Sequence, residues 1–257
     1  NVVQQPQNVV AGARFAQSVS AEIIDDYYNR VTRVTSSATL VANLKSATNS
    51  ALISTSPEFT AQNGLVVFDG LTFESAGSRF IQFASGGSSS LPNLSSITSA
   101  TFVITHAAPS ALQWVTQPAI SVANDAAIAG QGAAYPELRA LDRFGNLVNT
   151  GTVSYTAEVT STPAPQSFTG VNTDGVLGVG TFQNLKLKAT VGNYTIRFKA
   201  NTDTNASYFA SISHTIEVVH GVPTQVVATT HPTAVRAGVN FATQPIIQIR
   251  DSAGNRV

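Results

Sequence analysis

Residues 104–109, Ile-Thr-His-Ala-Ala-Pro, return at 218–223 as Val-Val-His-Gly-Val-Pro. His106 matches His220 and Pro109 matches Pro223, both at an offset of 114 positions. A constant offset between matched residues is the signature of an internal repeat. The chain therefore contains a unit of about 110 residues that occurs more than once.

A second block occurs three times and extends this repeat to both ends of the chain. Its members share the order Pro, Ala-Gly, an aromatic residue, Asp, and then Asn next to an apolar residue. The first copy is Pro6, Ala11-Gly12, Phe15, Asp25 and Asn29-Arg30-Val31; the third, at identical spacing, is Pro232, Ala237-Gly238, Phe241, Asp251 and Asn255-Arg256-Val257; the middle copy is aligned as Pro118, Ala129-Gly130, Tyr135, Asp142 and Gly145-Asn146-Leu147-Val148. A third block, residues 68–73, returns as residues 182–187. We predict two full repeats, residues 1–105 and 106–219, and the first third of another, residues 220–257.

Within each repeat, apolar residues alternate with polar ones. Val153, Tyr155 and Ala157 alternate with Ser154 and Thr156. This period of two is that of a strand with one buried face. Turn signals separate such runs at Asn63-Gly64, Asp174-Gly175, Gly192-Asn193 and Gly254-Asn255, and only short stretches such as 123–129 have a helical composition. The pattern predicts an all-β fold of tandem antiparallel β-sandwiches of Greek-key type, two complete and one partial.

The order Gln-Pro, Ala-Gly-x-x-Phe, Asp-x-x-Gly-Asn-x-Val resembles the bacterial Ig-like repeats that occur in tandem in large cell-surface proteins. The resemblance covers essentially the whole chain. It implies an Ig-like fold and a role as stalk, adhesin, surface-layer or filament component, and it implies no catalytic residue. The first copy departs from the pattern, because Tyr28 stands where Gly145 and Gly254 stand in the others. An unchanged turn requires a positive φ at Tyr28, which is costly, so we expect either that strain or a different loop.

Composition excludes several classes of function. The 257 residues include 14 basic and 14 acidic side chains, so the chain lacks the positive surface that nucleic acid or an anionic membrane requires. There is no cysteine for a disulfide or a thiolate metal site, and no apolar run approaches the length of a membrane span. Charged residues make up only 11%, and Ser, Thr, Asn and Gln keep the surface polar, as is common in exported proteins. We expect a secreted or cell-surface location, with any anchor outside this segment.

The acidic turns are candidate calcium sites. Asp25 and Asp26, with Glu22 nearby, are the best candidates, but Ca²⁺ needs about 6–8 oxygen ligands and each loop carries one or two carboxylates. We favour a structural role in which the Asp side chain caps its own turn, so no metal or cofactor is predicted. The four histidines include no close pair with metal-ligand spacing.

Three further sets of residues are candidates for contact or modification. Tyr27 and Tyr28 are adjacent and cannot both point inward, so at least one is predicted to be exposed and able to stack on a sugar ring. Trp114 is expected in the core or at a repeat junction. Glycosylation sequons begin at Asn93, Asn193 and Asn205.

The sequence favours a non-catalytic structural segment of an extracellular surface protein, not an enzyme. The alternative is an adhesin or a carbohydrate-binding module of a secreted protein. The expected partners are neighbouring repeats of the same chain, other copies of it, or glycans. The third repeat exposes an apolar face that either the continuing chain or another copy must cover, with the continuing chain the favoured explanation.

Overall fold

The computed structural model describes residues 1–34, 37–91, 93–132, 135–202, 207–233 and 236–257. These residues form strands, turns and irregular segments, and none of them lies in a helix. The all-β prediction is confirmed, whereas the helical expectation for 123–129 is wrong. Ala123 ends the strand Ser121–Ala123, and the chain then turns tightly at Asp125, which has a positive φ of 62°. No helix in the described part of the chain is long and apolar enough to cross a membrane.

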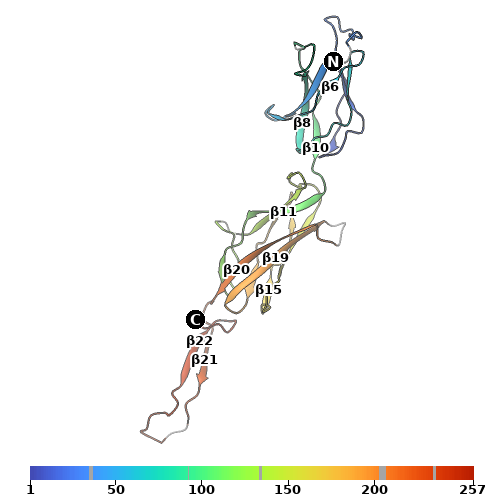
Figure 1. The fold of residues 1–257 in the computed structure, drawn as a ribbon. Helices are drawn as coiled ribbons and strands as arrows, with labels where there is room; N and C mark the ends of the chain where they lie inside the picture. The colour runs from blue at the N-terminus through green and yellow to red at the C-terminus, as the bar shows by residue number, and fades with distance from the viewer. Residues whose placement is uncertain (35–36, 92, 133–134, 203–206, 234–235) are drawn as a thin grey trace. The chain divides into compact units, whose positions relative to one another are not determined.

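The first compact unit contains Asn1–Ala108 together with the turn Asp142–Asn146. Its two sheets form a sandwich, with strand order β1-β3-β7 in one sheet and β2-β10-β8-β4-β5 in the other (Figure 1). β6 and β9 add to the second sheet through β4 and β8. The strands are β1 Val2–Gln4, β2 Val9–Val10, β3 Val19–Glu22, β4 Thr39–Ser46, β5 Leu52–Thr55, β6 Phe59–Thr60, β7 Leu65–Phe68, β8 Gly77–Ser85, β9 Ile97–Thr98 and β10 Phe102–Thr105.

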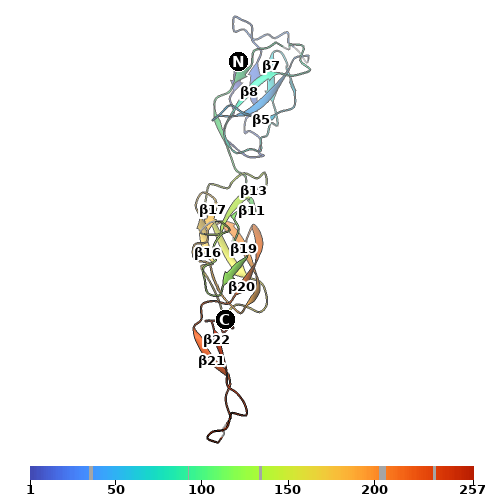
Figure 2. The same cartoon turned by 90° about the vertical axis from the view of Figure 1, so that its left-hand side faces the viewer.

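The second compact unit contains Pro109–Leu141 and Leu147–Val257. Its sandwich repeats the first, with orders β11-β13-β17 and β12-β20-β19-β14-β16, and β15 pairs separately with β18. The long strands β19 and β20 lie side by side in both views (Figures 1 and 2). The strands are β11 Pro109–Thr116, β12 Ser121–Ala123, β13 Glu137–Asp142, β14 Val153–Val159, β15 Ser167–Thr169, β16 Asn172–Gly175, β17 Val179–Thr181, β18 Lys186–Lys188, β19 Gly192–Thr202 and β20 Ala210–Val219.

One strand pair in each sandwich corrects the antiparallel prediction. β2 pairs with β10 in parallel, and β12 pairs with β20 in parallel, whereas pairs such as β3–β7 and β19–β20 are antiparallel. The reason is that the first part of each repeat changes sheets. β1 lies beside β3 in one sheet, and the chain then crosses to the other sheet as β2, where it runs in the same direction as the last strand.

The cores follow the predicted alternation. In the second unit, Val153, Tyr155 and Ala157 on β14 are buried, and the Tyr155 hydroxyl donates a 2.7 Å hydrogen bond to the Gly178 carbonyl. Trp114 packs edge-on against Phe198, with ring centroids 5.0 Å apart, which confirms its expected place against the core. The first unit has an independent core. Its buried residues include Leu40, Ala42, Leu44, Val66, Phe68, Ile81 and Phe83.

Residues after β20 form a two-stranded sheet, β21 (Gln225–Thr230) with β22 (Ile246–Arg250), which Figure 2 shows as a ribbon of its own. It reproduces the start of the first repeat. Ala228 faces Ile247 just as Val2 faces Ala21, and both ladders have a register shift at the next pair. Ile247 is 64% exposed, as the uncovered apolar face of a partial repeat predicts.

The structure corrects the alignment of the middle copy. Gly12 donates its N–H to the Phe73 carbonyl, and the equivalent bond runs from Asp125 to Leu187, so Asp125 rather than Gly130 matches Gly12. Both residues have positive φ, 75° for Gly12 and 62° for Asp125. The predicted match failed because the inserted residues of this repeat follow the turn instead of preceding it.

The same shift places buried Ile128, rather than Tyr135, in the position of Phe15. Two predicted turns are also wrong. Gly192 and Asn193 are the first residues of β19 and pair with Val218 and Glu217 of β20. Asp174 and Gly175 lie within β16, and the chain reverses two residues later, where Leu177 and Gly178 have φ values of 50° and 78°.

Candidate functional site

The five-residue turn Asp-x-x-x-Asn occurs once in each repeat and closes on itself in the same way each time. In the second repeat, Asp142 Oδ1 accepts the N–H groups of Phe144 at 2.8 Å and Asn146 at 2.9 Å. Asp142 Oδ2 accepts the Asn146 side-chain amide at 2.9 Å. The turns at Asp25 and Asp251 make the same three bonds. The Asp residue therefore caps its own turn, which is the role favoured over calcium.

The Asp251 turn also binds the end of the preceding repeat. Asp251 Oδ2 accepts the Gly221 N–H at 2.8 Å. The Asn255 side chain bonds twice, donating from Nδ2 to the Ala189 carbonyl at 3.0 Å and accepting the Val191 N–H on Oδ1 at 2.8 Å. One acidic side chain and one amide side chain thus link the turn to two backbone groups of the second sandwich and to one of the segment that follows β20.

The Asp142 turn makes the equivalent contacts within the first compact unit. Asp142 Oδ2 accepts the Ala107 N–H at 2.8 Å, Asn146 Nδ2 donates to the Glu74 carbonyl at 2.7 Å, and Asn146 Oδ1 accepts the Ala76 N–H at 2.9 Å. Ala107 corresponds to Gly221 at the repeat offset. The docking of this turn is therefore a property of the repeat, and it occurs twice in one chain.

Both docked carboxylates are buried and charged. Asp142 is 2% exposed and Asp251 is 0% exposed. Burial opposes ionisation, but hydrogen bonds from the Gly221 N–H and from Asn255 outweigh it and lower the pKa of Asp251 to about 2. The pKa of Asp142 is lowered in the same way, against the effect of burial, by Asn146, Ala107 and Phe144. At neutral pH each carboxylate is an acceptor held in place by four hydrogen bonds, three from its own turn and one from the segment that follows the last strand of the preceding sandwich.

The Asp25 turn has the same fold but is exposed along its whole length. The Tyr28 φ is 64°, close to the 81° of Gly145 and the 88° of Gly254, so the turn is unchanged and Tyr28 carries the strain. Tyr27 and Tyr28 are 84% and 85% exposed. Hydrogen bonds from Asn29 lower the pKa of Asp25.

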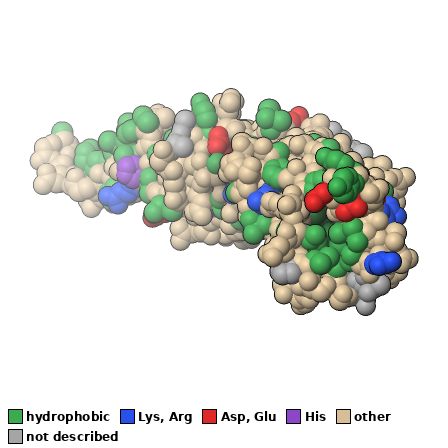
Figure 3. Space-filling view, turned by 90° about the horizontal axis from the view of Figure 1, so that it is seen from above, with side chains coloured by type: hydrophobic (Ala, Val, Ile, Leu, Met, Phe, Trp, Pro, Cys, Tyr) green, Lys and Arg blue, Asp and Glu red, His purple; other side chains and the backbone are tan. Residues whose placement is uncertain are grey.

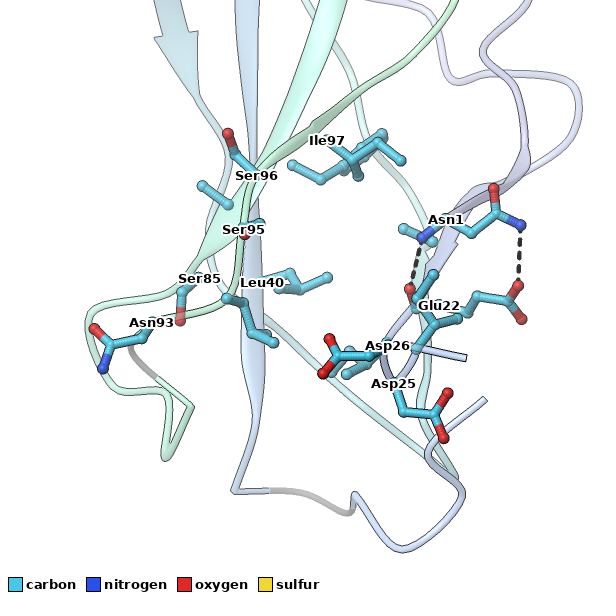
Figure 4. A pocket seen from close by; sticks show the side chains of 16 residues that line it. Asn1, Glu22, Asp25, Asp26, Leu40, Ser85, Asn93, Ser95, Ser96 and Ile97 are labelled. Atoms are coloured by element: carbon cyan, nitrogen blue, oxygen red, sulfur yellow. Dashed lines mark hydrogen bonds between the residues drawn. The ribbon is translucent and has the colours of Figure 1, made fainter. Parts of the chain in front are cut away.

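A hollow of about 450 Å³ lies beside this exposed turn (Figure 4). Glu22, Asp25 and Asp26 lie on one side of it, and Asn93 with a run of serines lies on the other. Asn1 bonds to Glu22 through its side chain and its amino group. Seen from above, acidic side chains lie next to hydrophobic ones on the part of the surface nearest the viewer (Figure 3).

The calcium candidates do not gather into a metal site. Asp25 uses both oxygens within its own turn, and Glu22 pairs with Arg30 at 2.7 Å. Among the described residues, no group of three His, Asp or Glu side chains is placed to hold a metal ion.

Two of the three predicted glycosylation sites are exposed. Asn93 lies in the loop before β9, and Asn193 lies near the start of β19. Asn205 lies outside the described residues. Modification at these positions stays a prediction.

Sequence reasoning missed the docking role of the asparagine. Asn29, Asn146 and Asn255 recur at the fifth position of the turn, while the fourth position varies between Tyr and Gly. A turn needs a left-handed residue at only one of these positions, so a recurring Asn at the other was the available signal that the side chain has a second partner.

No protein-family model matches the chain, and no curated protein matches it. Among solved structures, a beta-glycosidase from Bacteroides vulgatus is similar over 81% of this chain and 23% of its own, at 13% identity and a TM-score of 0.34. The S-layer protein rSbsC(31-844) is similar over 99% of this chain and 30% of its own, at 14% identity and a TM-score of 0.29. A putative membrane anchored protein from Corynebacterium diphtheriae is similar over 88% and 56%, at 11% identity and a TM-score of 0.32. This chain spans about a fifth of the first glycosidases it matches, and at these TM-scores the likeness carries no argument about function.

Proposed function

We propose that this chain is a non-catalytic structural segment of an extracellular surface protein, in which each sandwich is fastened to the one before it by its own Asp-x-x-x-Asn turn. The repeated docking of the Asp142 and Asp251 turns carries this proposal. The larger protein would be a stalk, filament, sheath or surface layer, built from neighbouring repeats and from other copies of itself.

The chemistry of the turn suits such a fastening. A buried carboxylate that accepts several N–H groups fixes the geometry of the contact. If the turn moved away, a charge and a backbone donor would be left unpaired in a site with little water. The asparagine adds a donor and an acceptor to backbone groups two residues apart. Pro109 and Pro223 further restrict the connecting segments. Together these features favour a turn that stays bound to the end of the preceding sandwich.

An extracellular location is supported by composition. Polar uncharged side chains replace charged ones, which make up 11% of the chain, and the sandwich cores need no disulfide. Immunogold electron microscopy of the source cells, with antibodies raised against the chain, tests both parts of the proposal. We expect label on a surface fibre, layer or projection; label confined to the cell interior would contradict it.

A second candidate function, carbohydrate binding, rests on the exposed Tyr27 and Tyr28 beside the polar hollow. Aromatic faces next to polar groups are suited to sugar rings. Binding on a glycan array that is lost when both tyrosines are replaced by alanine would favour this function. Tyr208→Ala is the matched control, because Tyr208 is an exposed tyrosine of the second unit. A chain that binds no glycan on the array leaves the structural proposal as the better one.

A further inference from the structure

The Asp25 turn is built for docking but has no docked partner in the described part of the chain. Its internal bonds match those of the two docked turns. Yet Asp25 and Asn29 are exposed, whereas Asp251 and Asn255 are 0% and 8% exposed. The Asp25 turn lacks the surface that covers the two docked turns. In both of those turns, this surface offers two backbone N–H groups and one carbonyl at the end of a sandwich.

The two docked turns also differ at the third turn residue and at the residue of the preceding repeat that occupies the position of Gly12. In the first unit, the Phe144 ring packs on the core and lies against Gly12, where an added Cβ atom would come within 2.6 Å of Phe144 Cε2. Because Gly12 has a φ of 75°, a side chain there is also strained. An aromatic residue at the third turn position therefore requires glycine at this place on the preceding repeat.

The second unit has the opposite combination. Asp125 takes the position of Gly12 and carries a side chain, while Ala253 takes the position of Phe144. The Asp125 side chain pairs with Lys186 at 3.4 Å. The first junction therefore combines a large turn residue with glycine, and the second combines a small turn residue with a residue that has a side chain.

The first repeat carries Tyr27 at the third turn position, which is the aromatic type. We infer that the Asp25–Asn29 turn is a docking surface for the end of a further sandwich repeat of this type, and that Tyr27 selects a partner with glycine at the position of Gly12. In the docked state Asp25 Oδ2 accepts a backbone N–H, Asn29 bonds to a carbonyl and an N–H, and the Tyr27 ring covers the partner's glycine. This inference rests on the proposed fastening role.

The test joins a second copy of residues 1–112 directly ahead of Asn1 of the full chain. Leu112 matches Val226 at the repeat offset, and Val227 corresponds to Asn1, so this fusion reproduces the native spacing of a junction. The added end carries Gly12 and offers the N–H of its Ala107 to Asp25. The peptide that spans the Leu112–Asn1 joint occurs only once in the fusion. Hydrogen exchange read by fragmentation of this peptide therefore reports on the added Ala107 amide alone.

We expect the added Ala107 amide to exchange at least tenfold more slowly than in the same fusion carrying Asp25→Ala in the full-length part. Gly12→Asp in the added copy is expected to abolish most of this protection. Asp is tolerated at this backbone position, as Asp125 shows. Tyr27→Ala in the full-length part should then restore the protection, because it recreates the pairing of Asp125 with Ala253.

An unprotected added Ala107 amide, in a sample whose native Gly221 amide is protected, overturns the inference and leaves the proposed function standing. Rapid exchange at both amides would overturn the proposed function as well. Equal protection in the fusions with Gly12 and Gly12→Asp would refute selection by Tyr27.

Discussion

Replacing Asp251 by alanine tests how strongly the docked turn protects the Gly221 amide from exchange. Asp25→Ala, which changes the equivalent residue of an undocked turn, is the control. Both substitutions remove the same three bonds within the turn. Only Asp251→Ala also removes the bond to Gly221 and empties a buried carboxylate site. Asp25→Ala opens an undocked turn in the other unit and leaves the Gly221 bond intact, so it shows how the Gly221 amide behaves when no docking bond is lost.

The size of the effect follows from the bond that is lost. A hydrogen bond to a charged group contributes about 1.5–3 kcal/mol, so we take roughly 2 kcal/mol for the bond to Gly221. We expect Asp251→Ala to raise the exchange rate of the Gly221 amide about 30-fold more than Asp25→Ala does, as 2 kcal/mol requires.

The assay is amide hydrogen exchange of the full chain at neutral pH, read at Gly221, with the buried strand β14 as a reference for global stability. A Gly221 amide that exchanges equally in Asp251→Ala, Asp25→Ala and the unaltered chain would contradict this expectation. It would show that the carboxylate closes the turn but does not hold the segment that follows β20.

Three further outcomes follow from the same geometry. The folded-state pKa of Asp251 is depressed, so its contribution to stability is complete above pH ~4 and is lost as the pH falls towards about 2; the Gly221 amide should lose protection in that window, and a chain with Asp251→Asn should not show this pH dependence. Tyr28→Gly should stabilise the first unit by roughly 0.5–1 kcal/mol because it relieves a positive φ on an exposed residue, while Gly254→Ala should cost about as much in the second; denaturant titration of each variant checks the opposite signs. Removing divalent metal should change the melting temperature by no more than about 1–2 °C, because the carboxylate oxygens of Asp25 and Asp251 accept hydrogen bonds within their own turns. A larger drop on adding chelator would mean that a metal stabilises the folded chain.

Much of the fold was accessible from the sequence because each repeat carries the period of its strands. The alternation of Val153, Tyr155 and Ala157 identified a buried strand face, and the offset between His106 and His220 identified the repeat. The strand period follows from local backbone geometry, and the repeat offset follows from the length of the repeat. Both can therefore be read directly from the sequence.

The errors arose where the sequence gives residue types without backbone angles. Asp174-Gly175 is a typical turn dipeptide, yet the tight turn falls at Leu177-Gly178, because strand pairing keeps β16 extended to Gly175. Asp125 was not matched to Gly12 because the two share a left-handed backbone and a hydrogen-bond partner, not a residue type.

The docking site itself could be predicted only in part. The Asp cap was expected from the turn sequence, but its fourth hydrogen bond comes from a residue 30 positions away in one copy and 35 in the other. No local pattern specifies such a contact. Only the recurrence of Asn29, Asn146 and Asn255 pointed towards it.

We propose that the Asp-x-x-x-Asn turn fastens each repeat to the one before it, and the width of the distance distribution between two spin labels measures how firmly it does so. The chain has no cysteine, so Ser54→Cys and Ser213→Cys, at exposed strand positions of the two sandwiches, provide the only thiols for spin labels. Pulsed electron paramagnetic resonance should give a single narrow distance distribution for this chain and a clearly broader one when Asp142→Ala is added, with Asp25→Ala leaving the width unchanged. A distribution that is already broad with Asp142 intact, or that keeps its width in Asp142→Ala, would contradict the account.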